Sequence, residues 1–214
     1  MYSKCPGMYG LKPWFQDHLR PPARILAGIG VRANQVTVAA CMLSIGFGLS
    51  LSILRESRLF ILLPLVLLVR MWLNAMDGIM AREFGQKTRL GAYLNELADV
   101  VSDTFLYVPF AQLDGVSPGW MWGVIVLAVI SEMAGTVAVM TGASRRYDGP
   151  MGKSDRALIF GAAGLWVGLA GALPGPIAHL LPIFLTLTLT LTIVNRVRQG
   201  LRESQAGGNE HAAI

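Results

Sequence analysis

The sequence predicts an all-α integral membrane protein with six transmembrane helices, and three observations support this prediction. Of the 214 residues, 53% are hydrophobic and only 14% are charged, whereas about a quarter of the residues in a soluble domain are charged. Several apolar runs approach the roughly 20 residues that a helix needs to cross the hydrocarbon core. The basic residues lie mainly at the ends of these runs, where membrane proteins carry their topology signals.

Composition also excludes several classes of protein. The net charge of +5 does not indicate nucleic-acid binding, because the basic residues flank apolar runs instead of forming a patch of their own. The two cysteines, Cys5 and Cys41, are too few for a disulfide framework or a cysteine metal site. Residues 1–33 contain charges and prolines but no continuous apolar segment, so we expect no signal peptide.

We expect residues 1–33 to form an N-terminal segment that includes an interfacial helix. Between residues 11 and 30, apolar side chains are interspersed with basic ones, which favours a short helix lying on the membrane over a structureless leader. We expect this helix to be broken at Pro21 and Pro22, because proline removes a backbone donor and clashes with the preceding turn. The apolar side chains concerned are Trp14, Phe15, Leu19, Ile25 and Leu26.

The predicted transmembrane domain covers residues 34–196 and is followed by a cytoplasmic tail, residues 197–214. Its spans lie near residues 35–54, 59–80, 91–113, 119–141, 157–173 and 176–195. At 1.5 Å per residue, each is long enough to cross about 30 Å of hydrocarbon, or nearly so. Charged, glycine-rich or proline-rich segments separate them. The alternating Leu-Thr run at 185–192 is expected to be helical, because threonine can bond its own helix backbone.

The distribution of lysine and arginine predicts that both termini are cytoplasmic. One side of the membrane would carry fifteen basic residues, in the N-terminal segment, the 2–3 and 4–5 loops and the tail. The other side would carry only Arg55 and Arg58. This asymmetry follows the positive-inside rule, so the protein is expected in the inner membrane with its polar stretch facing the cytoplasm.

Polar side chains gather between residues 74 and 103, in the second and third predicted spans. Ionisable groups at membrane depth cost about 2.5–3.5 kcal/mol each on insertion scales, so they usually serve a function. Helical spacing places Asn74, Asp77 and Ala81 on one face of the second span. On the third span, one arc of about 100° contains four polar residues, namely Asn95, Glu96, Asp99 and Asp103.

The spacing of this stretch resembles the signature of the CDP-alcohol phosphotransferases, membrane enzymes that use CDP-linked donors. The matching residues are Asp77, Gly78, Ala81, Arg82, Gly91 and Asp99, with eight residues between Arg82 and Gly91. The resemblance implies that Asp77, Gly78, Ala81, Arg82 and Gly91 bind the nucleotide. It also implies that Asp99 is the general base and that Mg²⁺ or Mn²⁺ is held by hard oxygen ligands. Asn34-x-x-Thr37 resembles the family's entry motif, which implies that both residues also bind the nucleotide, although Asn34 is equally suited to cap a helix.

Asn74 and Asn95 stand where the family has its first and third aspartates. The expected metal ligands are therefore Asp77, Asn74, Asn95, Asp99 and Asp103. Three accounts stay open: two metals with Asp103 or Glu96 replacing the lost charge, one metal or weaker binding, and a degenerate site. Arg70 is expected either to pair with Asp103 or to tune the site. Glu132, also at membrane depth, receives no specific role.

The loop at 144–156 is the second candidate site. Arg145, Arg146, Lys153 and Arg156 either determine topology and contact anionic lipids or bind a phosphorylated acceptor. The resemblance implies transfer of a phosphatidyl group from CDP-diacylglycerol to a small hydroxylated acceptor, with or without a phosphate, releasing CMP in phospholipid synthesis. Headgroup transfer to diacylglycerol and a nonenzymatic nucleotide-lipid binder or transporter are the alternatives. Family members are commonly homodimers, so a homodimer is expected.

Overall fold

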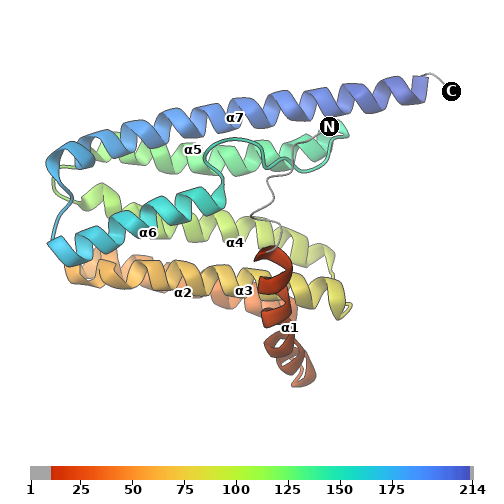
Figure 1. Ribbon diagram of the computed structural model, residues 1–214, viewed down its shortest axis with the longest axis horizontal. Coiled ribbons are helices and arrows are strands. Elements are labelled where there is room, and N and C mark those ends of the chain that lie inside the picture. Colours follow the sequence, from red (N-terminus) through yellow and green to blue (C-terminus); the bar gives the residue numbers. More distant parts are fainter. Residues whose placement is uncertain (1–10, 213–214) are drawn as a thin grey trace. The chain divides into compact units, whose positions relative to one another are not determined.

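The computed structural model describes the backbone of residues 11–212 and the side chains of residues 17–206. Within these residues every regular element is helical, which confirms the predicted all-α class (Figure 1). The elements are α1 (Leu11–Gly28), α2 (Ala33–Leu54), η1 (Ser57–Leu62), α3 (Leu63–Glu83), α4 (Arg89–Tyr107), η2 (Val108–Gln112), α5 (Pro118–Val137), η3 (Ala138–Thr141), α6 (Lys153–Ala170) and α7 (Gly175–Ala212).

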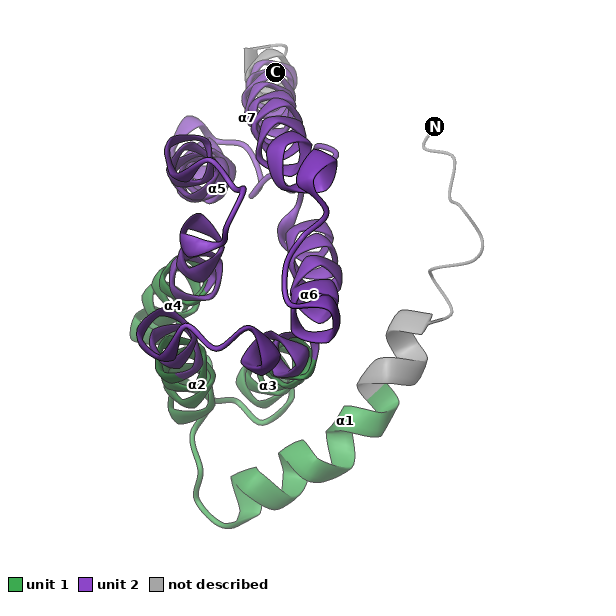
Figure 2. Cartoon of the chain, turned by 90° about the vertical axis from the view of Figure 1, so that its left-hand side faces the viewer, with its two compact units in different colours: residues 1–46, 65–102 green, residues 47–64, 103–214 purple. Residues whose placement is uncertain are grey.

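The chain divides into two compact units, coloured separately in Figure 2. Unit 1 contains the chain up to Gly46 together with Leu65–Ser102. Unit 2 contains Phe47–Pro64 and the chain from Asp103 onwards. Most of the polar stretch therefore belongs to unit 1, and the basic loop belongs to unit 2.

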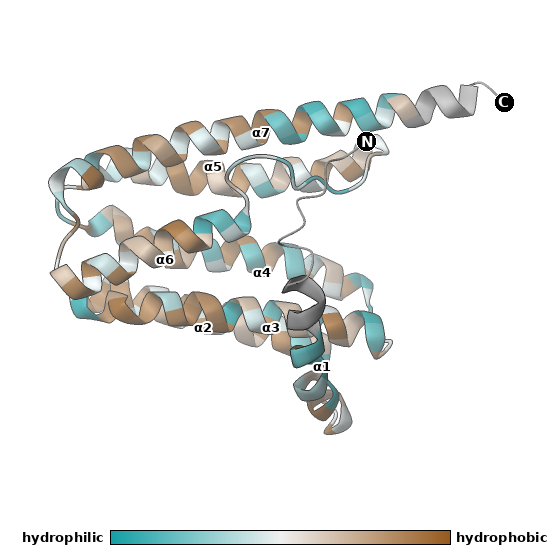
Figure 3. Ribbon diagram, viewed as in Figure 1, coloured by the Kyte–Doolittle hydropathy of each residue, from teal (hydrophilic) through white to brown (hydrophobic). Residues whose placement is uncertain are grey.

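Four helical segments in the described part of the chain are long and apolar enough to cross a membrane. They are Ala33–Leu54, Ser57–Glu83, Pro118–Thr141 and Gly175–Ala206, and they coincide with the first, second, fourth and sixth predicted spans. Figure 3 shows the hydrophobic residues along them. Helices α4 and α6 occupy the other two positions but are not among these segments, since charged residues such as Asp99 and Arg156 interrupt their apolar runs. Their crossing of the membrane stays a prediction.

Helix α1 continues through Pro21 and Pro22, so the predicted break is wrong. The two prolines remove backbone donors, but α1 is held from outside by packing. Leu19 and Ala23 are buried in a core that also contains Ala33, Val36, Ile79 and Met80. Burial of an apolar face supplies most of the stability of a helix in a protein, which explains why α1 persists. Its position on a membrane surface stays a prediction.

The Leu-Thr run lies in the middle of α7, which confirms that it is helical and not a strand. Each threonine hydroxyl in this run donates to the carbonyl oxygen four residues earlier at 2.8 Å. These bonds satisfy the hydroxyls inside an apolar helix. In unit 2, α7 packs along α5, and Leu185 and Leu189 are fully buried (Figure 1).

Helix α6 packs closely on η1 because it carries glycine at the contact. A Cβ atom at Gly168 would meet the backbone nitrogen of Ile61 and would lie 2.8 Å from Ile61 Cα. A Cβ atom at Gly164 would lie 2.6 Å from Leu63 Cδ2. The two glycines therefore allow the two segments of unit 2 to approach each other.

Replacing Gly168 by alanine is expected to lower the thermal unfolding midpoint in detergent, because the new methyl group overlaps the backbone of Ile61. Overpacking of this kind costs about 1–3 kcal/mol. Gly123→Ala in α5 is the matched control, since a Cβ atom there meets nothing within 4 Å. Alanine in a helix is favoured over glycine by roughly 0.5–1 kcal/mol, so this control should unfold at the same temperature or higher. Equal midpoints for both variants would contradict the close contact.

Candidate active site

Asp77 is a residue of α3 in unit 1, and its side chain lies buried against the start of α2. Its side chain is 5% exposed. The hydroxyl of Thr37 on α2 donates to Asp77 Oδ2 at 2.6 Å and also reaches the carbonyl of Ala33 at 3.2 Å. The structure thus brings together Asp77 and Thr37, two residues that the sequence placed in the same nucleotide site. The contact leaves Thr37 as a fixed donor that orients the carboxylate.

Asp99 on α4 faces two side chains of α3. The Asn74 amide donates to Asp99 Oδ1 at 2.9 Å. The Arg70 guanidinium donates to the same oxygen at 3.4 Å and to the Asp99 carbonyl at 3.1 Å. Because Arg70 is only 3% exposed, its charge acts on Asp99 with little solvent screening. Arg70 is thus placed to tune the site through Asp99, and its pairing with Asp103 stays a prediction.

The glycines of the polar stretch leave space that neighbouring polar side chains occupy. A Cβ atom at Gly91 would lie 2.6 Å from Asn34 Oδ1. Thr88 joins the two positions, since its hydroxyl accepts from the Gly91 amide at 2.9 Å and from the Asn34 side chain at 3.3 Å. Gly78 similarly leaves room for Arg82, whose guanidinium nitrogens would lie 3.1 Å from a Cβ atom there.

The candidate metal ligands of unit 1 are oxygen donors of the kind that a hard divalent cation prefers. Asp77 and Asp99 supply carboxylates, and Asn74 and Asn95 supply amide oxygens. Proteins bind Mg²⁺ through one or two carboxylates together with substrate phosphates, which matches this set. Among the described side chains, no three histidine, cysteine, aspartate or glutamate residues gather as a metal-holding group. The metal ligands named from the sequence therefore stay predictions.

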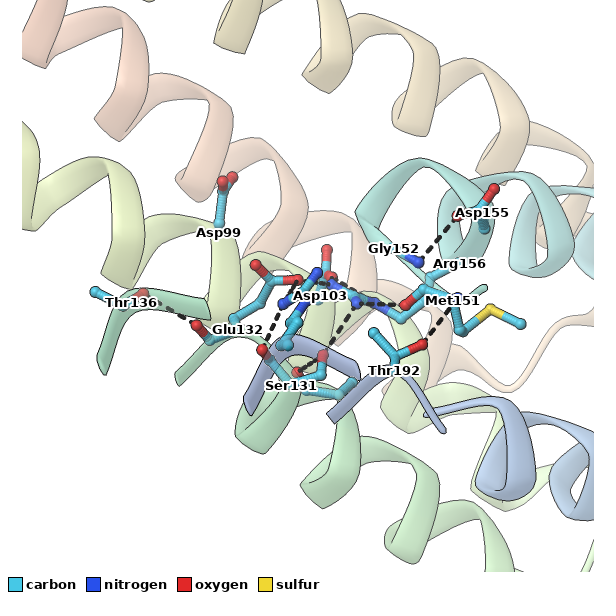
Figure 4. Close-up of polar contacts among 12 residues, drawn as sticks. Asp99, Asp103, Ser131, Glu132, Thr136, Met151, Gly152, Asp155, Arg156 and Thr192 are labelled. Carbon is cyan, nitrogen blue, oxygen red and sulfur yellow. Dashed lines mark hydrogen bonds and ion pairs between the residues drawn. The ribbon is translucent and has the colours of Figure 1, made fainter. Parts of the chain in front are cut away.

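Asp103, one turn after Asp99 on α4, belongs to a buried ion cluster in unit 2 (Figure 4). Arg156 of α6 donates to Asp103 Oδ2 through Nη2 at 2.8 Å and through Nε at 3.3 Å. Arg156 Nη2 also lies 3.0 Å from Glu132 Oε1, and Nη1 reaches Ser131 Oγ at 3.4 Å. Arg156 is 1% exposed, so these acceptors replace its hydration.

Glu132 of α5 is the shared partner of three arginines from different segments. Besides Arg156, its Oε1 lies 3.4 Å from Arg196 Nη1 of α7. Its Oε2 lies 3.4 Å from Arg145 Nη2, in the segment before α6. Arg196 also donates to the carbonyl of Ser131. We call Arg145, Arg156, Arg196, Asp103 and Glu132 the arginine cluster.

Two members of the arginine cluster were missed as site residues. The sequence assigned Arg196 only to topology and gave Glu132 no role. A buried charge on each of two long apolar segments is the available signal, since such charges are usually paired. Arg145 and Arg156 were expected at a common site, and the structure does place both against Glu132.

The remaining basic residues of the loop are also engaged. Arg146 Nε donates to the Asp148 carboxylate at 2.8 Å, and its Nη1 pairs with Glu203 of α7. The hydrogen bond to Asp148 raises the pKa of Arg146 above its ordinary value. Lys153 is the first residue of α6 and is half-buried. Arg145, Arg146 and Arg156, three of the four basic residues of the loop, therefore form ion pairs.

The family model for CDP-alcohol phosphatidyltransferases matches residues 31–194. The chain belongs to this family. The match covers both the polar stretch and the arginine cluster except for Arg196, which lies two residues beyond it. Membership makes this protein a relative of membrane transferases of phospholipid biosynthesis, and the four helical segments that are long and apolar enough to cross a membrane agree with that class.

Two relatives of this chain are known by name. The inner membrane protein YnbA of Escherichia coli is 46% identical over 76% of this chain and 81% of its own length. The archaetidylinositol phosphate synthase of Pyrococcus horikoshii is 28% identical over 64% of this chain and 74% of its own length. The first is similar throughout most of the chain, and the second carries a name for a specific product.

The fold is shared with phosphatidylinositol phosphate synthase of Mycobacterium tuberculosis. Its structure with CDP-DAG bound superposes with a TM-score of 0.67 at 21% identity, covering 87% of this chain and 92% of the other. A second structure of that protein, in complex with manganese and citrate, also gives 0.67, at 22% identity, with 87% and 88% covered. At this identity the likeness establishes the fold alone.

Proposed function

We propose that this protein transfers a phosphatidyl group from CDP-diacylglycerol to a small hydroxylated acceptor and releases CMP. The observation that carries the proposal is the placement of Asp77 and Asp99 in unit 1. Thr37 orients the first carboxylate, and Asn74 and Arg70 orient the second. Membership in the CDP-alcohol phosphatidyltransferases and the shared fold support this choice of donor.

In the proposed reaction, the acceptor oxygen attacks the phosphorus of the phosphatidyl group. The bond from this phosphorus to the bridging oxygen of the diphosphate breaks, and CMP leaves with the electron pair. Asp99 takes the proton of the acceptor hydroxyl. A bound Mg²⁺ or Mn²⁺ supplies neutralisation of the diphosphate charge. Arg70 and Asn74 hold Asp99 as an oriented carboxylate before the donor binds.

The other parts of the proposed site follow from the motif residues. Asp77 is the main metal ligand, and Asn74, Asn95 and Asp99 contribute further oxygens, so that the site takes one divalent ion. Gly78, Ala81, Arg82, Gly91, Asn34 and Thr37 bind the cytidine diphosphate. We place this site on the cytoplasmic side of the inner membrane, in a homodimer. An E. coli relative named as an inner membrane protein supports the location.

Release of CMP tests the proposal directly. Purified protein with CDP-diacylglycerol and Mg²⁺ should release CMP only when an alcohol acceptor is added, and mass spectrometry of the lipids should identify the acceptor from a screen. If the protein instead consumes diacylglycerol together with a CDP-linked headgroup, the reaction is headgroup transfer, with the CDP-linked headgroup as donor and diacylglycerol as acceptor. No turnover with any pair, despite binding of CDP-diacylglycerol, would make the protein a nonenzymatic binder.

A further inference from the structure

We infer that Glu132 determines which acceptor the arginine cluster takes: an alcohol that carries no phosphomonoester. The inference rests on the proposed phosphatidyl transfer and specifies its acceptor. Basic residues on this loop are the expected place for a phosphorylated acceptor, but here their charge is already balanced within the protein. Glu132 pairs with all three arginines of the cluster, and it does so from a helix on which the sequence indicated no site.

Both carboxylate oxygens of Glu132 have arginine partners. Oε1 pairs with Arg156 at 3.0 Å and with Arg196 at 3.4 Å, and Oε2 pairs with Arg145 at 3.4 Å. The three arginines come from α6, α7 and the segment before α6, so one residue of α5 fixes their relative positions. Glu132 is therefore a positioning residue for the arginine cluster as well as its counter-ion.

The charge balance of the cluster disfavours a phosphate dianion. Three guanidinium groups face the carboxylates of Asp103 and Glu132, which leaves one net positive charge. Next to them, Arg146 faces two further carboxylates, Asp148 and Glu203, so the two groups together are neutral. A phosphomonoester carries about −1.5 to −2 charges at pH 7. Beside Arg156 and Arg196, which are buried, that excess would remain poorly compensated.

The cluster nevertheless keeps a donor for a neutral ligand. Arg196 is 2% exposed, and its buried Nε has no acceptor among the described residues. A buried donor left without an acceptor is costly. The hydroxyl oxygen of an alcohol can accept this hydrogen bond without bringing a charge, and its proton can be donated to a carboxylate of the cluster. Paired arginine and carboxylate groups thus suit a polyol better than an anion.

Matched acceptor pairs test the inference on the wild-type protein. Glycerol is compared with glycerol 3-phosphate, and inositol with inositol 1-phosphate, by CMP release at pH 7.5 and constant CDP-diacylglycerol. We expect the KM of the parent alcohol to be lower than that of its phosphomonoester by about tenfold or more. The reason is repulsion between the phosphate and the Glu132 carboxylate within a few ångströms. A lower KM for the phosphomonoester in both pairs would overturn the inference.

Glu132→Gln then tests the residue itself. This change keeps the shape of the side chain and removes its charge, so the KM of the phosphomonoester should fall by about tenfold while the donor KM is unchanged. The double variant Glu132→Gln, Arg145→Gln restores the net charge of the cluster and should restore the wild-type preference. Equal changes for both members of a pair, or a parallel change in the donor KM, would reduce Glu132 to a structural residue and overturn the inference.

A binding measurement separates this inference from the proposed function. Breaking a buried ion pair is strongly destabilising, so the unfolding midpoint of each variant is measured first. If Glu132→Gln does not fold, the matched acceptor pairs on wild-type protein decide the inference. If no acceptor supports CMP release, the proposed function fails, and calorimetry of the same pairs with wild-type protein decides the inference alone. Tighter binding of the phosphomonoester there would overturn it.

Discussion

Replacing Asp99 by asparagine is expected to slow CMP release by about 10²–10⁴-fold, the usual effect of removing a general base. An amide has the shape of the carboxylate but cannot take the proton of the acceptor hydroxyl. The donor should still bind, because Asp77 and Thr37 are untouched. We expect the loss to appear in kcat, measured by CMP release, with little change in the affinity for CDP-diacylglycerol.

Folding must be controlled in this experiment, because Asp99 faces the buried Arg70. The unfolding midpoint of Asp99→Asn is therefore compared with that of the wild type, and rates are expressed per folded protein. Asp114→Asn is the matched substitution: Asp114 is exposed, lies between η2 and α5, and belongs to neither site. It should retain wild-type turnover. Turnover by Asp99→Asn within a few-fold of this control would remove Asp99 from the role of base.

The spans that the sequence predicted well are those with continuous apolar runs. Hydropathy identified α2, α3, α5 and α7 because each contains a long apolar run with few charged residues. Helices α4 and α6 are less distinct because charged residues, such as Asp99 and Arg156, interrupt their apolar runs. Charged residues at a candidate site thus lower the hydropathy by which a span is identified from the sequence.

Local spacing predicted the residues of the polar stretch but not all of their contacts. Positions three or four residues apart share a helical face, and for that reason Asn74 and Asp77 could be grouped from the sequence. The pairing of Asn74 with Asp99, 25 residues away, depends on how two helices pack. Pro21 and Pro22 show the same limit, since packing of α1 outweighed a strong local signal.

The arginine cluster could not be derived from the sequence, because its members are joined across long distances. Glu132 and Arg156 are 24 residues apart, and the contact of Arg196 with Ser131 spans 65. Counting positive charges in the loop suggested an anion site, but the count omitted carboxylates on other helices. Three-dimensional pairing, and not the number of arginines, determines what charge the site presents.

Removing divalent metal is expected to abolish CMP release, and Mg²⁺ or Mn²⁺ should restore it. The reason is the oxygen-rich donor set of Asp77 and Asp99 with the amides of Asn74 and Asn95, which suits hard cations. After treatment with a chelator and its removal, turnover is measured at increasing metal concentration. The same titration with Asp77→Asn should need much more metal, since Asp77 is the only carboxylate that α3 brings to this site.

The number of ions is a sharper test than activity, because it depends on charge within unit 1. Two carboxylates with two neutral amides favour one bound cation over the pair that two-metal sites hold about 3.5–4 Å apart. Titration of the chelator-treated protein with Mn²⁺, followed by electron paramagnetic resonance, should therefore give about one ion per chain at saturation. The double variant Asn74→Asp, Asn95→Asp adds two carboxylates and should bind a second ion. Two ions in the wild type would show that other oxygens, such as those of Glu96, replace the missing charge, and full turnover in the chelated protein would refute the metal-assisted reaction.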